Sequence, residues 1–254
     1  MSTPLKDQIV LVTGAGRGLG AALATAFAGE GAHVAINYRN SQAAAEALAA
    51  KLGPRTMAVQ ADVCAANSVA QMVDAITAKF GAPTTVIHNA LADYSFNGDG
   101  RDTLDTLTEG ALDAQFRTAV TGALNVIQAT SPAMSAQGFG RIVTIGSNLV
   151  QNPVVPYHDY TAAKSALLAL TRTAAAALGP KGITVNMISG GLLRTTDASA
   201  GTPDAVFDLL AANTPLRQVP TPEEAADAAM FFASPWARAI TGQNLIVDGG
   251  LVFG

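Results

Sequence analysis

Three polar side chains in the second half of the chain have the types and the spacing needed for acid–base chemistry on an oxygen atom. Tyr160 and Lys164 are four residues apart, so on a helix their side chains share one face. A free tyrosine has a pKa of about 10, and a neighbouring ammonium group favours the phenolate and lowers that pKa. Tyr160 could then exchange a proton with a carbonyl or alcohol oxygen, while Ser147 holds the same oxygen by a hydrogen bond.

A tyrosine and a lysine at this spacing are also common on ordinary helices, so the pair alone is weak evidence for catalysis. Tyr157 and His158 lie close by, but neither has a lysine four residues further on. The hypothesis therefore depends on whether the rest of the chain provides a site for a redox partner.

A glycine-rich turn near the N-terminus provides such a site. It reads Thr13-Gly14-Ala15-Gly16-Arg17-Gly18-Leu19-Gly20, after the apolar run Ile9–Val12 and before an apolar helix expected over 21–28. Glycines allow close approach of the backbone to a ligand, and a helix N-terminus favours an anion. A phosphate-binding loop of the Gly-Lys-Ser/Thr type is excluded by Leu19 and Gly20. The turn predicts a dinucleotide site.

The elements that position these residues alternate along the chain. Strands are expected over 9–12, 34–38, 57–61, 85–88 and 141–145, with helices over 41–52, 67–80, 109–137 and from Tyr160 to about Leu178. We expect Asn67 or Ser68 to cap the second of these helices. This alternation predicts one α/β domain over 1–254, a Rossmann-type doubly wound parallel sheet with helices on both faces.

The carboxyl ends of parallel strands share one edge, so Thr13, Tyr38, Asp62 and Asn89 should crowd together. An NAD site places a carboxylate after the second strand, whereas this chain has Tyr38 and Arg39 there. Arg39, with Arg17 in the glycine turn, could instead bind a 2′-phosphate. Both could also be ordinary surface arginines. The missing acid predicts NADP(H) as the cofactor.

Composition limits the remaining classes. The chain has 254 residues, of which 49% are hydrophobic and 13% charged, and a net charge of −4, which gives no reason to expect a nucleic-acid or membrane partner. Cys64 is the only cysteine, and the N-terminus lacks a signal peptide, so we expect a cytoplasmic protein. The uncharged stretch 118–140 contains proline, asparagine and glutamine, which favours an amphipathic helix over a membrane span. The aspartates in the polar excursion 91–108 lack the spacing of a calcium loop, and we expect no metal.

Together these motifs make the chain resemble the short-chain dehydrogenase/reductases over essentially its whole length. The matching residues are the glycine turn, Asp62-Val63, Asn89-Ala90, Ser147 thirteen residues before Tyr160-x-x-x-Lys164, then Asn186, Gly191 and Thr195 after the sixth strand, and Thr241-Gly242-Gln243 to Asp248-Gly249-Gly250. Within that family the chain is most similar to 3-oxoacyl-[acyl-carrier-protein] reductases.

The resemblance implies NADPH-dependent reduction of a small-molecule carbonyl compound to an alcohol, with 3-oxoacyl thioesters among the candidate substrates, by a homotetramer. It implies that Ser147, Tyr160 and Lys164 are catalytic. The implied cofactor-binding residues are Gly14, Arg17, Gly18, Leu19, Gly20, Tyr38, Arg39, Asp62, Val63, Asn89, Ala90, Tyr160, Lys164, Gly191 and Thr195. The segment 192–218 is expected to be an apolar substrate lid, which suits acyl chains, steroids and other hydrophobic ketones alike.

Three departures from the family pattern keep other functions open. The family's Asn-Asn-Ala-Gly turn is His88-Asn89-Ala90-Leu91 here, and its Pro-Gly after the sixth strand is Gly190-Gly191. We expect His88 to bind neighbouring backbone rather than to catalyse. The family has an asparagine on the long helix that helps to hold a water of a proton relay, and this chain has Ala119 at that position. Gln115, one turn earlier, could replace the asparagine, or it could be an ordinary solvated helix residue. A dinucleotide-binding sensor is therefore an alternative to an enzyme, and a scaffold protein is a more remote one.

Overall fold

Seven parallel strands form the centre of the molecule, in the order β3-β2-β1-β4-β5-β6-β7. The computed structural model describes residues 3–92, 100–194 and 196–253. The strands are β1 (Ile9–Val12), β2 (His33–Tyr38), β3 (Thr56–Gln60), β4 (Thr85–His88), β5 (Gly140–Ser147), β6 (Ile183–Gly190) and β7 (Asn244–Val247). The central strands β1, β2, β4, β5 and β6 are buried almost throughout, β5 along its whole length, as parallel sheets require, whereas the edge strands β3 and β7 are partly exposed.

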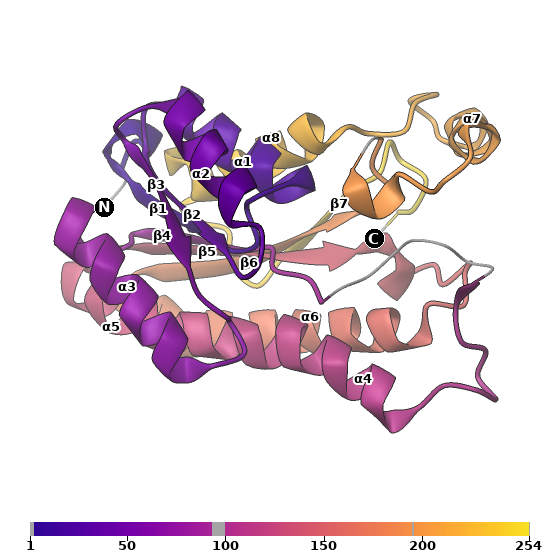
Figure 1. Cartoon of the computed structure of the whole chain (residues 1–254), viewed down its shortest axis with the longest axis horizontal. Helices are drawn as coiled ribbons and strands as arrows, with labels where there is room; N and C mark the ends of the chain where they lie inside the picture. The colour runs from indigo at the N-terminus through magenta and orange to yellow at the C-terminus, as the bar shows by residue number, and fades with distance from the viewer. Residues whose placement is uncertain (1–2, 93–99, 195, 254) are drawn as a thin grey trace.

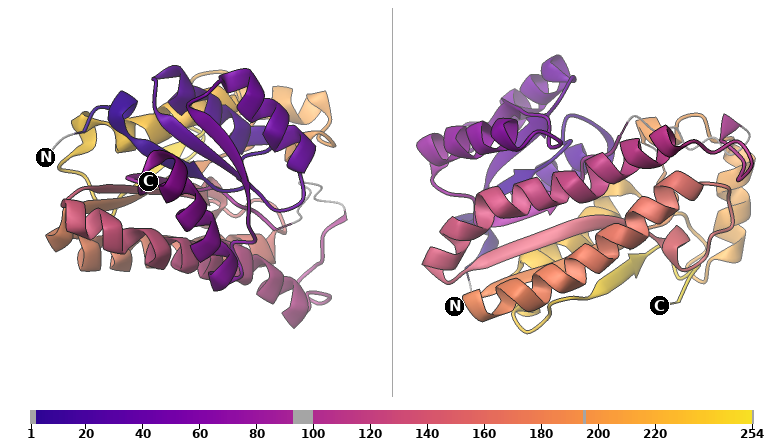
Figure 2. Two further views of the ribbon diagram at one scale, coloured as in Figure 1. Left: turned by 60° about the vertical axis from the view of Figure 1, so that its left-hand side comes forward. Right: turned by 90° about the horizontal axis from the view of Figure 1, so that it is seen from below.

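Helices cover both faces of this sheet (Figure 1). They are α1 (Gly18–Gly29), α2 (Gln42–Leu52), α3 (Ala66–Phe80), α4 (Glu109–Phe116), α5 (Gly122–Gln137), α6 (His158–Leu178), α7 (Asp204–Asn213) and α8 (Pro222–Ala233). One apolar core joins α1, α2 and α8 to the sheet, and a second joins α3, α5 and α6 to the opposite face. Figure 2 shows the long helices α5 and α6 side by side beneath the sheet. The predicted doubly wound α/β fold is confirmed.

The glycine turn follows β1, the strand at which the order of strand addition across the sheet reverses. The chain builds β1, β2 and β3 outward on one side, then returns through α3 to place β4 on the other side of β1. The helices that follow these two strands, α1 after β1 and α5 after β4, therefore pack on opposite faces of the sheet. A crevice at such a point is where open α/β sheets bind ligands.

Three local expectations need correction. The helix expected over 109–137 is interrupted by a π-helical segment, η3 (Arg117–Thr121), between α4 and α5. Neither Asn67 nor Ser68 caps α3: the cap residue is Ala65, and the Ser68 hydroxyl accepts a hydrogen bond from the Asp62 amide at 3.1 Å instead. Asn186 lies inside β6 rather than after it.

Three elements in the last quarter of the chain were not predicted as separate units, namely α7, α8 and β7. The start of α8 carries a capping box, in which the hydroxyl of Thr221 accepts from the Glu224 amide and the Glu224 carboxylate accepts from the Thr221 amide. Within the described residues, no helix is both long and apolar enough to cross a membrane.

Candidate active site

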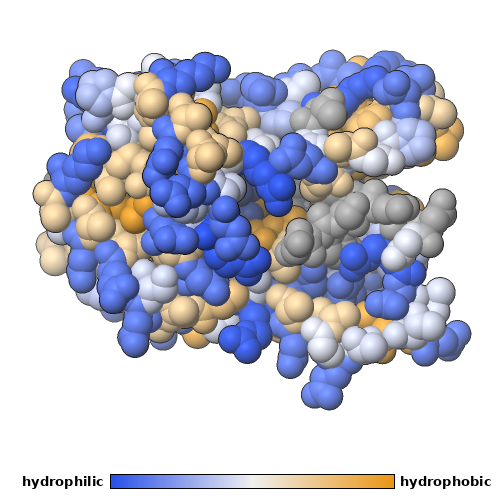
Figure 3. All heavy atoms as spheres, in the orientation of Figure 1, coloured by the Kyte–Doolittle hydropathy of each residue, from blue (hydrophilic) through white to orange (hydrophobic). Residues whose placement is uncertain are grey.

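A cleft of about 1230 Å³ opens at the carboxyl ends of the strands. Figure 3 shows this side of the molecule hollowed between the part that carries α7 and the part that carries α4. Tyr38, Asp62 and Asn89 line the cleft, and Thr13 lies beneath them, where its buried hydroxyl accepts the amide hydrogen of Asn89 at 3.0 Å. The expectation that these four residues crowd one edge of the sheet is confirmed.

The glycine turn forms a cradle that side chains would fill. Gly14 has a φ of +62°, and a Cβ atom there would lie 2.9 Å from the Cα of Ala90. A Cβ atom on Gly20 would collide with the Gly14 carbonyl oxygen and lie 2.7 Å from Nδ2 of Asn89. Helix α1 begins at Gly18, and its cap residue Arg17 makes no side-chain hydrogen bond to the helix. The cradle and the helix N-terminus fit the pyrophosphate of a dinucleotide.

The end of the cleft beyond the glycine turn carries charged side chains. Arg39 follows β2, is exposed and lines the cleft, where Asp62 and Val63 lie after β3. The other predicted cation, Arg17, is 66% exposed and forms an ion pair with Asp197, with Nη1 and Oδ2 3.6 Å apart. Arg39 is therefore the better placed of the two arginines to meet a phosphate, because Arg17 already has a carboxylate partner.

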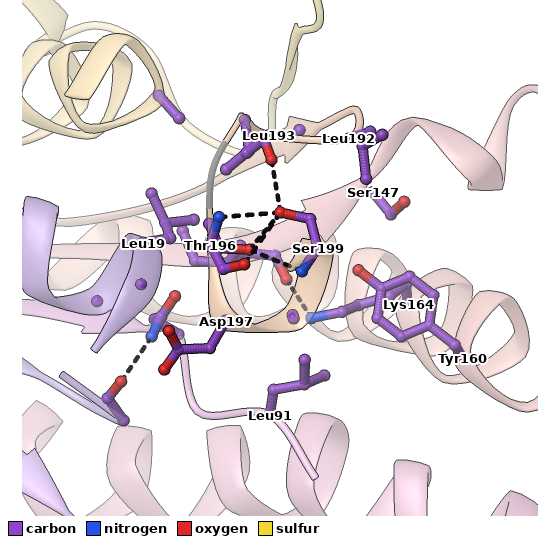
Figure 4. A pocket seen from close by; sticks show the side chains of 18 of the residues that line it. Leu19, Leu91, Ser147, Tyr160, Lys164, Leu192, Leu193, Thr196, Asp197 and Ser199 are labelled. Atoms are coloured by element: carbon purple, nitrogen blue, oxygen red, sulfur yellow. Dashed lines mark hydrogen bonds between the residues drawn. The ribbon is translucent and has the colours of Figure 1, made fainter. Parts of the chain in front are cut away.

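The three residues predicted to be catalytic meet at the other end of the cleft. Ser147 is the last residue of β5, and Tyr160 and Lys164 lie in the first two turns of α6; all three are buried and line the cleft. Figure 4 shows the hydroxyl groups of Ser147 and Tyr160 on the same side of the pocket, with Lys164 behind the tyrosine. The Lys164 Nζ donates to the Ile145 carbonyl at 2.7 Å and lies 5.4 Å from the centre of the Tyr160 ring.

Burial controls the protonation states of Tyr160 and Lys164. It raises the pKa of Tyr160 to about 12, and a hydrogen bond with Ser147 opposes this increase only in part. Burial also lowers the pKa of Lys164 to about 8. In the protein without its cofactor, desolvation of the phenolate outweighs the lowering expected from the ammonium group, so the pKa of Tyr160 is raised. A protonated tyrosine at neutral pH is the form that can donate to a carbonyl oxygen.

The departures at Leu91 and Ala119 have structural consequences. Leu91 packs with Tyr157 and Tyr160 and lines the cleft beside them. Ala119 is buried within the π segment. Gln115 is also buried, but it lines a smaller neighbouring cavity, which Lys164 does not line. The structure thus gives no support to Gln115 as a substitute for the family's helix asparagine.

Several polar residues of the cleft were not predicted. Asn148 lines it directly after Ser147, and Ser41 lines it two residues after Arg39, so proximity to a strand end was the available signal. Thr196 and Ser199 line it as a reciprocal capping pair, a spacing that was visible in the sequence. Of the remaining predicted residues, Gly191 lines the cleft, and Thr195 lies outside the described residues.

The predicted lid and excursion both border this site. Leu192, Leu193 and Val206 of the segment 192–218 line the cleft, whereas Leu209 is 63% exposed. In the described part of the excursion 91–108, Arg101 donates to the buried Asp159 at 2.7 Å, one residue before Tyr160. The described residues contain no group of three His, Cys, Asp or Glu side chains arranged to hold a metal ion.

Known proteins resemble this chain over most of its length. Residues 14–252 match the family described as Enoyl-(Acyl carrier protein) reductase. The 3-oxoacyl-[acyl-carrier-protein] reductase of Synechocystis sp. is 35% identical, over 98% of this chain and 99% of its own length, and the corresponding enzyme FabG of Staphylococcus epidermidis is 33% identical, over 96% and 99%. A probable galactose dehydrogenase, GalD, of Rhizobium meliloti is 32% identical, over 97% and 96%.

A solved structure gives the same relationship in three dimensions. The gluconate 5-dehydrogenase from Burkholderia cenocepacia, in complex with NADP and tartrate, superimposes with a TM-score of 0.87 at 31% identity, covering 96% of this chain and 94% of that one. These relatives cover between 96% and 98% of the chain. The chain belongs to the short-chain dehydrogenase/reductase family of oxidoreductases.

Proposed function

We propose that the protein is an NADPH-dependent carbonyl reductase in which Tyr160 is the proton donor. The observation that carries this proposal is the meeting of Ser147, Tyr160 and Lys164 at one end of a cleft whose other end carries Arg39. The cradle at Gly14 and Gly20 accommodates a pyrophosphate between these ends. The NADP complex of the gluconate 5-dehydrogenase neighbour supports the same cofactor.

In this mechanism the chain's own residues control the oxygen of the substrate. NADPH, when bound, supplies a hydride to the carbonyl carbon. The Ser147 hydroxyl donates a hydrogen bond to the carbonyl oxygen, and the Tyr160 hydroxyl donates its proton to that oxygen as negative charge develops. The Lys164 ammonium, one helical turn from Tyr160, stabilises the phenolate that remains.

Cofactor choice depends on the end of β2 in this proposal. Tyr38 occupies the position where a carboxylate would accept the 2′-hydroxyl of NAD, and Arg39 follows it with an exposed guanidinium group. The guanidinium can pair with a 2′-phosphate in a bidentate manner. We therefore assign NADPH rather than NADH as the cofactor.

The lining of the cleft favours a substrate with an apolar chain. Leucine and valine side chains line its substrate end: Leu91, Leu149, Val155, Leu192, Leu193, Val206, Leu210 and Leu251. Such a surface gains free energy by burying an acyl chain, whereas a sugar would need a matching set of hydrogen-bonding groups. We propose a 3-oxoacyl thioester as the substrate, which is the substrate class in the names of the Synechocystis and Staphylococcus relatives.

A substrate panel tests this function. Purified protein is assayed with 3-oxoacyl thioesters, hydrophobic ketones and sugar acids, with NADPH and NADH in parallel. We expect turnover of the thioesters or ketones with NADPH. Preferred turnover of sugar acids would overturn the substrate class, and tight NADPH binding without turnover of any compound would favour the sensor alternative. The comparisons with dehydrogenases and reductases do not favour that alternative.

A further inference from the structure

We propose that His88 is a positioning residue, whose neutral imidazole ties the π segment of the long helix to the floor of the cofactor cleft. This inference rests on the proposed function for its kinetic part. His88 is the last residue of β4 and is 2% exposed, and it does not line the cleft. Its two ring nitrogens face two different parts of the site.

The first contact fixes the tautomer. Nε2 of His88 lies 3.3 Å from the carbonyl oxygen of Thr118, within η3. A carbonyl oxygen can only accept, so Nε2 carries the hydrogen and Nδ1 has a lone pair. Nδ1 lies 3.4 Å from the Thr13 hydroxyl, which must therefore donate to it.

The second contact completes the hydrogen bonding of Thr13. The Thr13 hydroxyl oxygen accepts the amide hydrogens of Asn89 and Ala90 at 3.0 and 2.9 Å, which occupies both of its lone pairs. Its single hydrogen remains for His88. A protonated imidazole would present a hydrogen at Nδ1 to an oxygen with no acceptor capacity left. Burial and, to a smaller extent, the charge of Lys164 lower the pKa of His88 to about 4, so the imidazole is neutral at physiological pH.

The two contacts join parts of the site with different tasks. On one side, Asn89 donates from Nδ2 to the carbonyl oxygens of Thr13 and Gly14, which fixes the cradle against the end of β4. On the other side, the π segment packs against α6, the helix of Tyr160 and Lys164. Gly122, just after the π segment, permits the close approach of this segment, since a Cβ atom there would lie 2.8 Å from Cγ2 of Val63 and 3.3 Å from Cε1 of His88. His88 thus links the cofactor cradle with the wall of the catalytic site.

Two substitutions separate the two links. In His88→Gln the amide nitrogen can reach the position of Nε2 and keep the Thr118 contact, while the acceptor for Thr13 is lost. In His88→Asn the carbonyl oxygen can take the position of Nδ1 and keep the Thr13 contact, while the Thr118 contact is lost. We expect His88→Gln to raise the NADPH Kd about threefold or more and to leave kcat within about twofold. We expect His88→Asn to lower kcat by about tenfold or more and to leave the Kd within about twofold.

His33→Gln is the matched control. The His33 imidazole is partly buried at the start of β2, at the amino ends of the strands and so away from the cleft, and it packs on Phe80. The His33→Gln substitution should change neither the NADPH Kd nor kcat. Equal proportional losses of affinity and turnover in both His88 variants, or no loss in either, would overturn the proposal, because a general packing role does not distinguish the two nitrogens.

Nitrogen-15 NMR of the histidine rings in the free, full-length protein tests the tautomer without any turnover. We expect one of the three histidines to stay neutral, with its hydrogen on Nε2, from pH 8 to about pH 5, and its signals to disappear in His88→Gln. An imidazolium at pH 6, or the hydrogen on Nδ1, would overturn the proposal. If the unmutated protein reduced no carbonyl compound, the proposed function would fail, while the NMR spectra and the NADPH titrations would still decide the role of His88.

Discussion

A single methyl group added at Gly20 tests the cradle with a clear expected sign. In Gly20→Ala the new carbon collides with the carbonyl oxygen of Gly14 and lies 2.7 Å from Nδ2 of Asn89. The Gly14 contact is backbone, so the turn must move. Overpacking of this kind costs about 1–3 kcal/mol of unfolding free energy. Because the displaced turn carries the amide groups of the cradle, we also expect the NADPH Kd to rise at least about tenfold, or about 1.4 kcal/mol.

Gly29→Ala is the matched control in the same helix. Gly29 is the last residue of α1, and a Cβ atom there has no heavy atom within 4 Å. The substitution should stabilise the protein by about 0.5 kcal/mol, since alanine has the higher helix propensity, and leave cofactor binding unchanged. Urea unfolding and NADPH fluorescence titration measure both quantities. A Gly20→Ala protein as stable as the unmutated one, with the same Kd, would refute the cradle.

Three further predictions follow from the charges and surfaces of the site. Arg39→Ala should remove most of an expected tenfold or greater preference for NADPH over NADH, as the loss of about one charged hydrogen bond implies. Arg55→Ala should not, because Arg55 lies just before β3 at the amino ends of the strands, where it donates to the Gly31 carbonyl. Equal affinities for the two cofactors in the unmutated protein would contradict the assignment. Burial lowers the pKa of Lys164 to about 8 and raises that of Tyr160 to about 12. We therefore expect kcat/KM for reduction to be level below pH 8 and to fall above it, because the ammonium group of Lys164 is lost. A profile that stays level to about pH 10 would contradict this. The protein should assemble as a homotetramer that covers apolar side chains such as Trp236 and Phe253, which are 80% and 84% exposed in one chain. Light scattering that returned a monomer at micromolar concentration would refute this prediction.

Much of the fold was predictable because its signals are local. The strands β1 and β4 have the predicted bounds, since continuous apolar runs are bordered by glycine, proline or polar residues. The convergence of Tyr38, Asp62 and Asn89 followed from the rule that parallel strands end at one edge. In these cases the chemistry of each residue and its place in a strand were sufficient to predict where it lies.

The features that were missed depend on contacts between distant segments. The π segment Arg117–Thr121 has no sequence signature of its own, and its Thr118 carbonyl is contacted by His88, thirty residues earlier. The direction of the Tyr160 pKa shift depends on how deeply the ring is buried, which the spacing to Lys164 does not reveal. Gln115 shares a helix face with Ala119, yet the packing of α4 directs it to a different cavity.

The most direct test of the central claim compares two buried tyrosines of the same cleft. Tyr160→Phe keeps the ring and removes only the hydroxyl group, and so does Tyr157→Phe, three residues earlier and equally buried. We expect Tyr160→Phe to lower kcat by about 10²-fold or more, the scale of losing a general acid, with the NADPH Kd nearly unchanged. Tyr157→Phe should retain kcat within about tenfold, because no lysine lies one turn further along the helix. Turnover by Tyr160→Phe equal to that of the unmutated protein would contradict the account and assign the proton transfer to another group.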